Sequence, residues 1–192
     1  MKWYALFVEI GYEEYIQNFL YRHFDQNQLT SMAPVRKLPE KRKGRISHIY
    51  RKMFPGYVLI RTNMTAELFY QLKRVPRVHR LLTSYHYYTH EQDSYFSSIP
   101  EDEMHMVLQL TKNGNCIDFS SIYVDGSKVT VKTGPLVGKE GIIKKVDKRK
   151  QRAKIRIDFM NTTHTMDVGI NVIPSSFPKY PFDSQKKLSH NS

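Results

Sequence analysis

Residues 53–60 read MFPGYVLI and follow directly on a basic run from Arg36 to Lys52. This run contains eight basic residues and one acid, Glu40, so it carries +7 of the chain's formal net charge of +12. The apolar segment after it is rich in aliphatic and aromatic residues, which is typical of a buried strand, and Pro55 is tolerated near a strand's start. We therefore predict a strand over residues 54–62 next to a strongly charged segment.

Apolar periodicity predicts further elements on both sides of this strand. Residues 3–10 have the composition of a buried strand, and residues 13–28 repeat apolar positions with the period of an amphipathic helix. A second helix is predicted after Thr65 as N-cap, a short strand over 78–83, and a third helix between Pro100 and Asn113. This order predicts an α+β sandwich of about 110 residues, with an antiparallel sheet and packed helices.

The pattern changes from Lys128 onward. Short runs of Val and Ile alternate with polar residues and are separated by Gly134, Gly138 and Gly141, as in a small β-barrel. We predict an N-terminal domain over 1–111, a linker over 112–121, a barrel over 122–173 and a disordered tail over 174–192. The abundance of β-branched residues and glycine favours a stable barrel over helices in the second domain.

Composition narrows the functional classes. A basic chain with a sequence pI near 9.7 suggests a polyanionic partner. Cys116 is the single cysteine, so we expect no disulfide, no zinc site and a cytoplasmic location. The sequence contains no apolar run near the roughly 20 residues of a membrane span. No nucleophile elbow, phosphate-binding loop or metalloprotease motif is present, so we expect a monomeric binding protein without catalytic residues, metal or cofactor, rather than an enzyme.

Four segments in order give the chain a resemblance to the NusG family. They are Trp3-Tyr4, residues 54–59, Val75-Pro76-Arg77-Val78, and residues 126–141. The resemblance covers about residues 2 to 173. It implies an NGN-type N-terminal domain followed by a KOW domain, which is an SH3-like barrel.

The resemblance also implies a transcription elongation factor that binds RNA polymerase and lies over upstream nucleic acid. In the family, aromatic residues of the first and second motifs line the polymerase-binding face. The matching residues here are Tyr4, Phe54 and Tyr57. We expect the side chain of Trp3 to point the other way, into the core, because successive side chains on a strand alternate.

The basic run is the predicted nucleic-acid site. Outside the run, the first 111 residues contain 7 basic and 10 acidic residues, so the charge is concentrated in one segment. Phosphates are contacted by Lys and Arg without reading the sequence, and the choice between an RNA hairpin and DNA stays open. The predicted residues are Arg36, Lys37, Lys41, Arg42, Lys43, Arg45, Arg51 and Lys52.

A second basic cluster spans a predicted hairpin of the barrel. Lys144, Lys154 and Arg156 are explained by solvent-facing strand positions. The turn Lys148, Arg149 and Lys150 is a possible second site for RNA or an acidic protein.

The strong positive charge, and Leu136 where relatives often have Phe, resemble specialised members of the family and most of all the LoaP group. This implies antitermination of particular operons through an RNA element, and it leaves contacts with Rho or the ribosome open. The alternative is a ribosome-associated or RNA-chaperone protein that uses its KOW barrel. The target operons, and antitermination as opposed to pausing, are not determined by the sequence.

Overall fold

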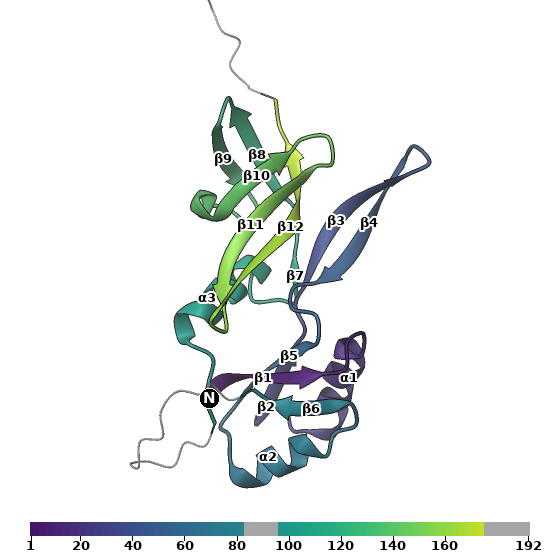
Figure 1. Ribbon diagram of the computed structural model, residues 1–192, viewed down its shortest axis with the longest axis vertical. Coiled ribbons are helices and arrows are strands. Elements are labelled where there is room, and N and C mark those ends of the chain that lie inside the picture. The colour runs from purple at the N-terminus through teal and green to yellow at the C-terminus, as the bar shows by residue number, and fades with distance from the viewer. Residues whose placement is uncertain (83–95, 175–192) are drawn as a thin grey trace, which may run out of the picture.

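The computed structural model describes residues 1–82 and 96–174. Its N-terminal part is a four-stranded antiparallel sheet in the order β2-β5-β1-β6 (Figure 1). The strands are β1 (Lys2–Val8), β2 (Leu29–Met32), β5 (Tyr57–Thr62) and β6 (Val78–Leu81). Helices α1 (Glu13–His23) and α2 (Ala66–Lys73) pack on one face of this sheet. The predicted α+β sandwich is therefore confirmed.

Local hydrogen bonds explain where the helices begin and end. The Thr65 hydroxyl accepts a hydrogen bond from the Leu68 amide at 3.2 Å, which confirms the predicted N-cap of α2. Helix α1 ends at His23, five residues before the predicted end. Asp25 causes this early end, because its carboxylate accepts from the Asn27 amide at 2.9 Å and its carbonyl accepts from the Leu29 amide at 2.9 Å.

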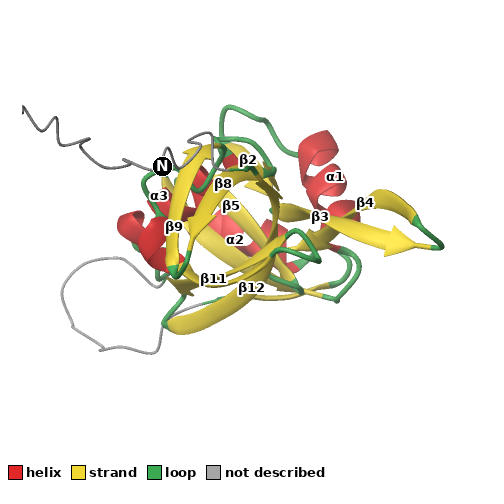
Figure 2. Cartoon of the chain, turned by 90° about the horizontal axis from the view of Figure 1, so that it is seen from above, coloured by secondary structure: helices red, strands yellow, loops and turns green. Residues whose placement is uncertain are grey.

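The basic run forms a β-hairpin that leaves the sheet. Strands β3 (Val35–Arg42) and β4 (Arg45–Lys52) are joined by Lys43 and Gly44, whose φ angles are 46° and 78°. Two positive φ angles in a two-residue loop match the twist of the flanking strands. The hairpin projects away from the rest of the chain in both views (Figures 1 and 2). Its free edge is β4, while β3 also pairs in parallel with β7 (Cys116–Ile117).

The C-terminal part is a curled sheet of five strands in the order β10-β11-β12-β8-β9. Its strands are β8 (Ser120–Asp125), β9 (Lys128–Thr133), β10 (Ile143–Asp147), β11 (Arg152–Phe159) and β12 (Thr162–Val172), with a 3-10 turn η1 (Glu140–Ile142) before β10. This confirms the predicted barrel. The predicted linker is not a free connection, because it contains β7 and the start of β8.

Two apolar cores hold the chain together. One lies between the sheet and helices α1 and α2 and contains Leu6, Ile16 and Val58. The other begins on the opposite face of the sheet, passes through α3 (Glu101–Thr111) and continues into the barrel. The N-terminal sheet and the barrel therefore share one continuous core.

None of the helices in the described part of the chain is long and apolar enough to cross a membrane. Nor do the described residues include a group of His, Cys, Asp and Glu side chains arranged to hold a metal ion. The predicted disordered tail lies outside the described residues, apart from Pro174.

A buried carboxylate fixes the loop before β5. The Glu13 side chain is 1% exposed, and it accepts hydrogen bonds from the Gly56 amide at 2.7 Å and the Gly11 amide at 3.0 Å. Burial alone would raise its pKa, but these backbone donors and the charge of Lys52 bring the pKa below its ordinary value. Glu13 thus ties the start of α1 to the Phe-Pro-Gly-Tyr segment.

We predict that Glu13→Gln lowers the free energy of unfolding by about 2 kcal/mol near neutral pH, because an amide can accept from only one of the two N–H groups. A lowered carboxyl pKa contributes stability above the ordinary pKa of 4.5, and that contribution is lost as the pH falls through the folded-state pKa. Urea titrations at several pH values should therefore show the difference shrinking in acid. Glu14→Gln, which changes an exposed neighbour in the same helical turn, is the matched control; equal effects of the two substitutions would contradict the assignment.

Candidate functional site

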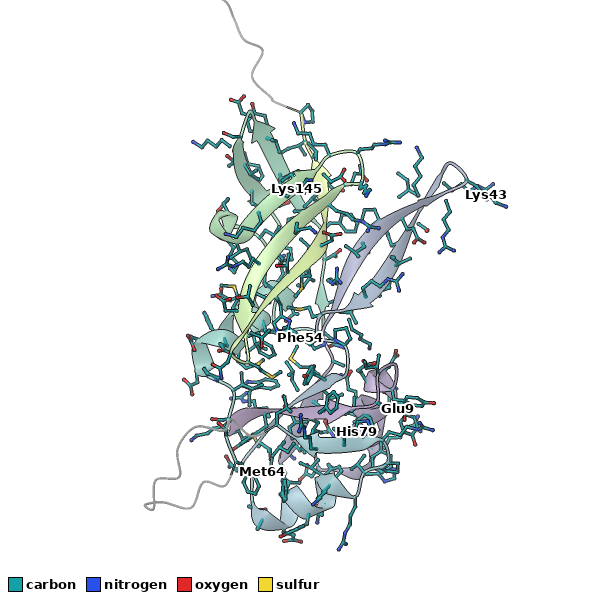
Figure 3. All side chains as sticks on the ribbon, viewed as in Figure 1. Glu9, Lys43, Phe54, Met64, His79 and Lys145 are labelled. Atoms are coloured by element: carbon teal, nitrogen blue, oxygen red, sulfur yellow. The ribbon has the colours of Figure 1, made fainter. Side chains whose placement is uncertain are left out.

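The hairpin separates its basic side chains into an exposed tip and a partly buried base. Lys41, Arg42, Lys43, Arg45 and Arg51 are exposed, and Lys43 marks the tip in Figure 3. Arg36, Lys37 and Lys52 are half-buried. Among the tip residues, Arg42 donates to Glu40 at 2.8 Å. The eight predicted residues thus lie on one hairpin, but they are not equally available to a ligand.

Two arginines join the base of the hairpin to the barrel. Arg36 Nη1 donates to the carbonyl oxygen of Asp167 at 2.7 Å, and Arg152 Nη2 donates to the carbonyl oxygen of Pro39 at 2.7 Å. The Nε atoms of both arginines have no hydrogen-bond partner in the described part of the chain. Burial lowers the pKa of Arg36, the charge of Asp167 opposes this, and the nearby charges of Arg152 and Arg51 add to it. Two cations therefore share one carboxylate at this contact.

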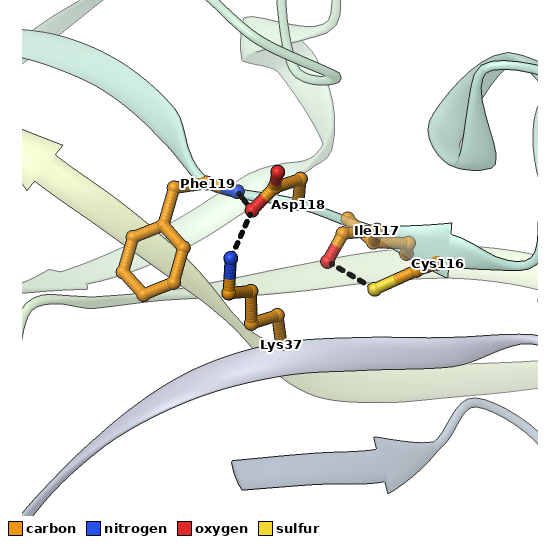
Figure 4. Close-up of polar contacts among 5 residues, drawn as sticks. All are labelled: Lys37, Cys116, Ile117, Asp118 and Phe119. Atoms are coloured by element: carbon orange, nitrogen blue, oxygen red, sulfur yellow. Dashed lines mark hydrogen bonds and ion pairs between the residues drawn. The ribbon is translucent and has the colours of Figure 1, made fainter. Parts of the chain in front are cut away.

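A third contact lies beside β7 (Figure 4). Lys37 Nζ is 3.3 Å from the Asp118 carboxylate and 5.7 Å from the centre of the Phe119 ring. The pKa of Asp118 is lowered mainly by a hydrogen bond from the Phe119 amide, although partial burial opposes this, and Lys37 lowers it further. Lys37 is therefore engaged within the chain rather than free at the surface.

The three predicted polymerase-binding aromatics do not share one surface. Tyr4 is 6% exposed and lies in the core beneath α1 and α2, and its burial raises the pKa of the phenol. Trp3 instead packs against the core that continues into the barrel. Trp3 thus packs against a core as predicted, but on the face that carries Phe54 and Tyr57, and the prediction that Tyr4 lies on that face is wrong. The alternation was correct, but the sequence did not reveal which face of β1 the first two helices cover.

Phe54 lies between the sheet and the barrel (Figure 3) and is 2% exposed. Its ring stacks on Phe159, at the end of β11, with ring centres 4.1 Å apart and an interplanar angle of 19°. The His164 ring meets its edge with ring centres 5.1 Å apart. Such aromatic pairs contribute about 0.5–1.5 kcal/mol beyond their area burial. In this arrangement the barrel covers Phe54.

Tyr57 lies on the same face of the sheet but is only half-buried. It is paired with Phe7 across β1 and β5, and the two ring centres are 5.6 Å apart. Phe7 in turn is 5.3 Å from the His79 ring on β6. These side chains form a partly exposed aromatic patch.

Helix α3 supplies another link to the barrel. The Glu103 carboxylate accepts a hydrogen bond from the Met160 amide at 2.6 Å, in the turn between β11 and β12. A carboxylate acceptor makes such a bond stronger than a neutral one. The β11–β12 turn is therefore held at Phe159 by a ring stack and at Met160 by a charged acceptor.

The second basic cluster follows the alternation expected for strands. Lys154 and Arg156 are exposed while their neighbours on β11 are buried. Lys148, Arg149 and Lys150 are also exposed and form the turn between β10 and β11, where the Asp147 carboxylate accepts from the Lys150 amide at 2.8 Å. The turn is accessible, but nothing in its geometry distinguishes it from a solvated loop.

Sequence reasoning missed the residues that join the domains. They are Glu103, Asp118, Asp167 and Gly169, which lie outside the predicted motifs and basic clusters. No periodic pattern marks them, because their role depends on contacts between distant segments, such as the bond from Arg36 to Asp167 across 131 positions.

Gly169 offers a direct test of the hairpin–barrel contact. A Cβ atom at this position would lie 2.7 Å from the Lys37 carbonyl oxygen and 2.9 Å from the Phe119 ring. We predict that Gly169→Ala pushes the hairpin off the barrel, because contacts this short force one side to move. Small-angle scattering should show a larger radius of gyration for this variant. Gly141→Ala is the control, since a Cβ there meets nothing within 4 Å. An unchanged scattering profile for Gly169→Ala would contradict the prediction.

Known proteins are similar to this chain in sequence and in fold. Residues 1–108 match the family model described as "Transcription termination factor nusG". The transcription termination/antitermination protein NusG of Buchnera aphidicola is 25% identical over 173 residues, covering 87% of this chain and 92% of the relative. The protein of the same name from Haemophilus influenzae is 27% identical over 161 residues, covering 81% and 84%.

A solved structure titled "Domain interaction in Thermotoga maritima NusG" has the same fold. Its TM-score is 0.51 at 20% sequence identity, and the match covers 88% of this chain and 93% of that one. The family model matches more than half of the chain, and the fold agrees across both domains. This chain therefore belongs to the NusG family.

Proposed function

We propose that this protein is a transcription elongation factor. It binds RNA polymerase through the face of the sheet that carries Phe54 and Tyr57, and it binds nucleic acid through the β3–β4 hairpin. The observation that carries the proposal is the hairpin itself, which projects from the chain (Figure 1) and contains eight basic residues, in a member of the NusG family. The first 111 residues outside the hairpin are net acidic in sequence, so the positive charge that attracts a polyanion is concentrated in one element.

The exposed tip of the hairpin is the main nucleic-acid site in this proposal. Four of the eight basic residues, Lys41, Arg42, Lys43 and Arg45, are exposed there, and Arg42 is paired with Glu40. Lys41, Lys43 and Arg45 are therefore the residues best able to contact phosphates. Lys37 and Arg36 support the hairpin instead, because their charged groups contact Asp118 and the Asp167 carbonyl.

Polymerase binding through Phe54 requires the barrel to move. Phe54 is buried by Phe159 and His164, whereas Tyr57 and Phe7 are partly accessible beside it. We infer that RNA polymerase and the barrel compete for the same face of the sheet. The barrel contact then sets the fraction of molecules whose Phe54 face is open to RNA polymerase. The apparent affinity for RNA polymerase equals the intrinsic affinity multiplied by that fraction.

We further propose that the protein acts on particular operons, as an antiterminator of the LoaP type recruited through an RNA element. The strong net charge of +12 and its concentration in one hairpin support this subgroup. Leu136 also supports it, because this residue is fully buried and its amide donates to Ser120 Oγ at 3.0 Å. The first loop of the barrel therefore does not expose a large apolar side chain at that position.

The second candidate function is a ribosome-associated or RNA-chaperone protein that uses its KOW barrel. The exposed turn Lys148, Arg149 and Lys150 favours it. The two functions differ in which basic element is needed and in whether the protein associates with RNA polymerase or only with ribosomes.

We predict that Lys41→Ala, Lys43→Ala and Arg45→Ala together weaken nucleic-acid binding and flatten its salt dependence. Log K falls with log salt, and each phosphate contact adds about 0.7–0.9 to the steepness of this fall. Loss of three contacts should therefore make the slope less steep by about 2–3. Filter binding at several salt concentrations measures the slope. The triple alanine variant of Lys148, Arg149 and Lys150 removes the same charge from the barrel and should leave the slope unchanged. The reverse result would favour the second candidate function.

We predict opposite effects on polymerase association for two changes at the covered face. Phe54→Ala with Tyr57→Ala should abolish co-purification of RNA polymerase, because it removes the binding aromatics. Glu103→Ala should increase co-purification severalfold, because it removes the acceptor that holds the β11–β12 turn beside Phe54 and keeps the aromatics. Nucleic-acid binding by both variants is the folding control. Association that survives in the double variant would count against the proposed face.

A further inference from the structure

One face of the hairpin carries large side chains that remain exposed, although Lys37 and His48 on the same face contact the segment after β7. The register pairs Lys41 with Ile46, Pro39 with His48, and Lys37 with Tyr50, so Ile46, His48 and Tyr50 lie on the same face of β4. Ile46 is 61% exposed and Tyr50 is 59% exposed. The opposite face contains Arg36, which contacts the barrel.

Protection of a sheet edge explains only part of this composition. An exposed edge strand such as β4 is normally protected by charged residues, which accounts for Arg45 and Arg51. It does not account for a large aliphatic and an aromatic side chain exposed in the same row. His48 adds a second ring to the row and packs with its ring centre 5.1 Å from that of Phe119, so the row is aromatic and bordered by Lys41.

This chemistry fits unpaired nucleotides. Alternate side chains along a strand are about 6.6 Å apart, which is close to twice the 3.4 Å spacing of stacked bases. A base ring therefore has room between neighbouring side chains of the row. Lys41 is exposed on the same face and Lys43 at the adjacent tip, where each can neutralise a phosphate. A duplex presents its phosphates but keeps its base faces stacked inside, so it cannot use the rings.

We propose that the β4 face formed by Ile46, His48 and Tyr50 binds the bases of single-stranded nucleic acid, with Tyr50 as the main stacking side chain. This proposal rests on the proposed nucleic-acid function of the hairpin and specifies its ligand as unpaired rather than duplex. The lysines attract the backbone, and the aromatic row selects strands whose bases are free.

Stacking and charge pairing can be separated experimentally. Fluorescence anisotropy of the full chain is measured with labelled 12-nucleotide RNA and DNA single strands and with the corresponding duplexes. Tyr50→Ala should weaken single-strand binding about 5- to 100-fold and leave the salt slope unchanged, because stacking releases no counterions. Its effect on duplex binding should be small. Comparison of the RNA and DNA strands shows which of them supplies the ligand.

Matched variants complete the test. Tyr50→Phe keeps the ring and should bind single strands like the parent protein, whereas Tyr70→Ala removes a tyrosine of the same exposure, 60%, from α2 and should change nothing. Equal single-strand affinity of Tyr50→Ala and the parent protein would overturn the proposal. So would a loss of duplex affinity in Tyr50→Ala as large as its loss of single-strand affinity, or a variant that loses only its association with RNA polymerase. If the parent protein bound no nucleic acid at all, the proposed function would fail as well. A normal salt slope with no Tyr50 effect would refute only the stacking role.

Discussion

The stack of Phe54 on Phe159 is the contact on which the arrangement of this protein depends. It joins the segment before β5 to the end of β11, and around it the core of the N-terminal sheet becomes continuous with the core of the barrel. The Glu103 bond to Met160 and the Arg36 and Arg152 bonds lie on the borders of the same contact. Together with the buried residues of α3, the stack makes the two domains share apolar packing as well as these polar links.

The border of this contact is built differently from its centre. The centre is apolar and well packed, so it contributes through burial. The border places two arginines near one carboxylate and leaves both Nε atoms without partners. A buried charge that lacks a full set of hydrogen bonds costs free energy, and removal of one partner costs more. The contact therefore combines a stabilising centre with an electrostatically imperfect border, which is consistent with an interface that opens in function.

The hairpin has two roles that its strands keep apart. Strand β3 lies against the barrel and β7, and its basic side chains Arg36 and Lys37 are used within the chain. Strand β4 is a free edge whose side chains face solvent. A ligand on β4 and the tip therefore does not have to displace the barrel. The proposed nucleic-acid site and the covered Phe54 therefore lie on different parts of the chain, connected through one hairpin.

Local patterns in the sequence determined the elements of both domains. Thr65, Pro76 and the apolar period delimit α2, and alternating Val and Ile residues predict the barrel, because each signal acts over a few residues. The charge of the hairpin was also readable, since it depends on composition alone. The face of β1 that α1 and α2 cover was not readable, so the burial of Tyr4 beneath these helices was not predicted. The burial of Phe54 and the use of Arg36, Glu103 and Gly169 were decided by tertiary structure, because they depend on contacts between distant segments that no local pattern encodes.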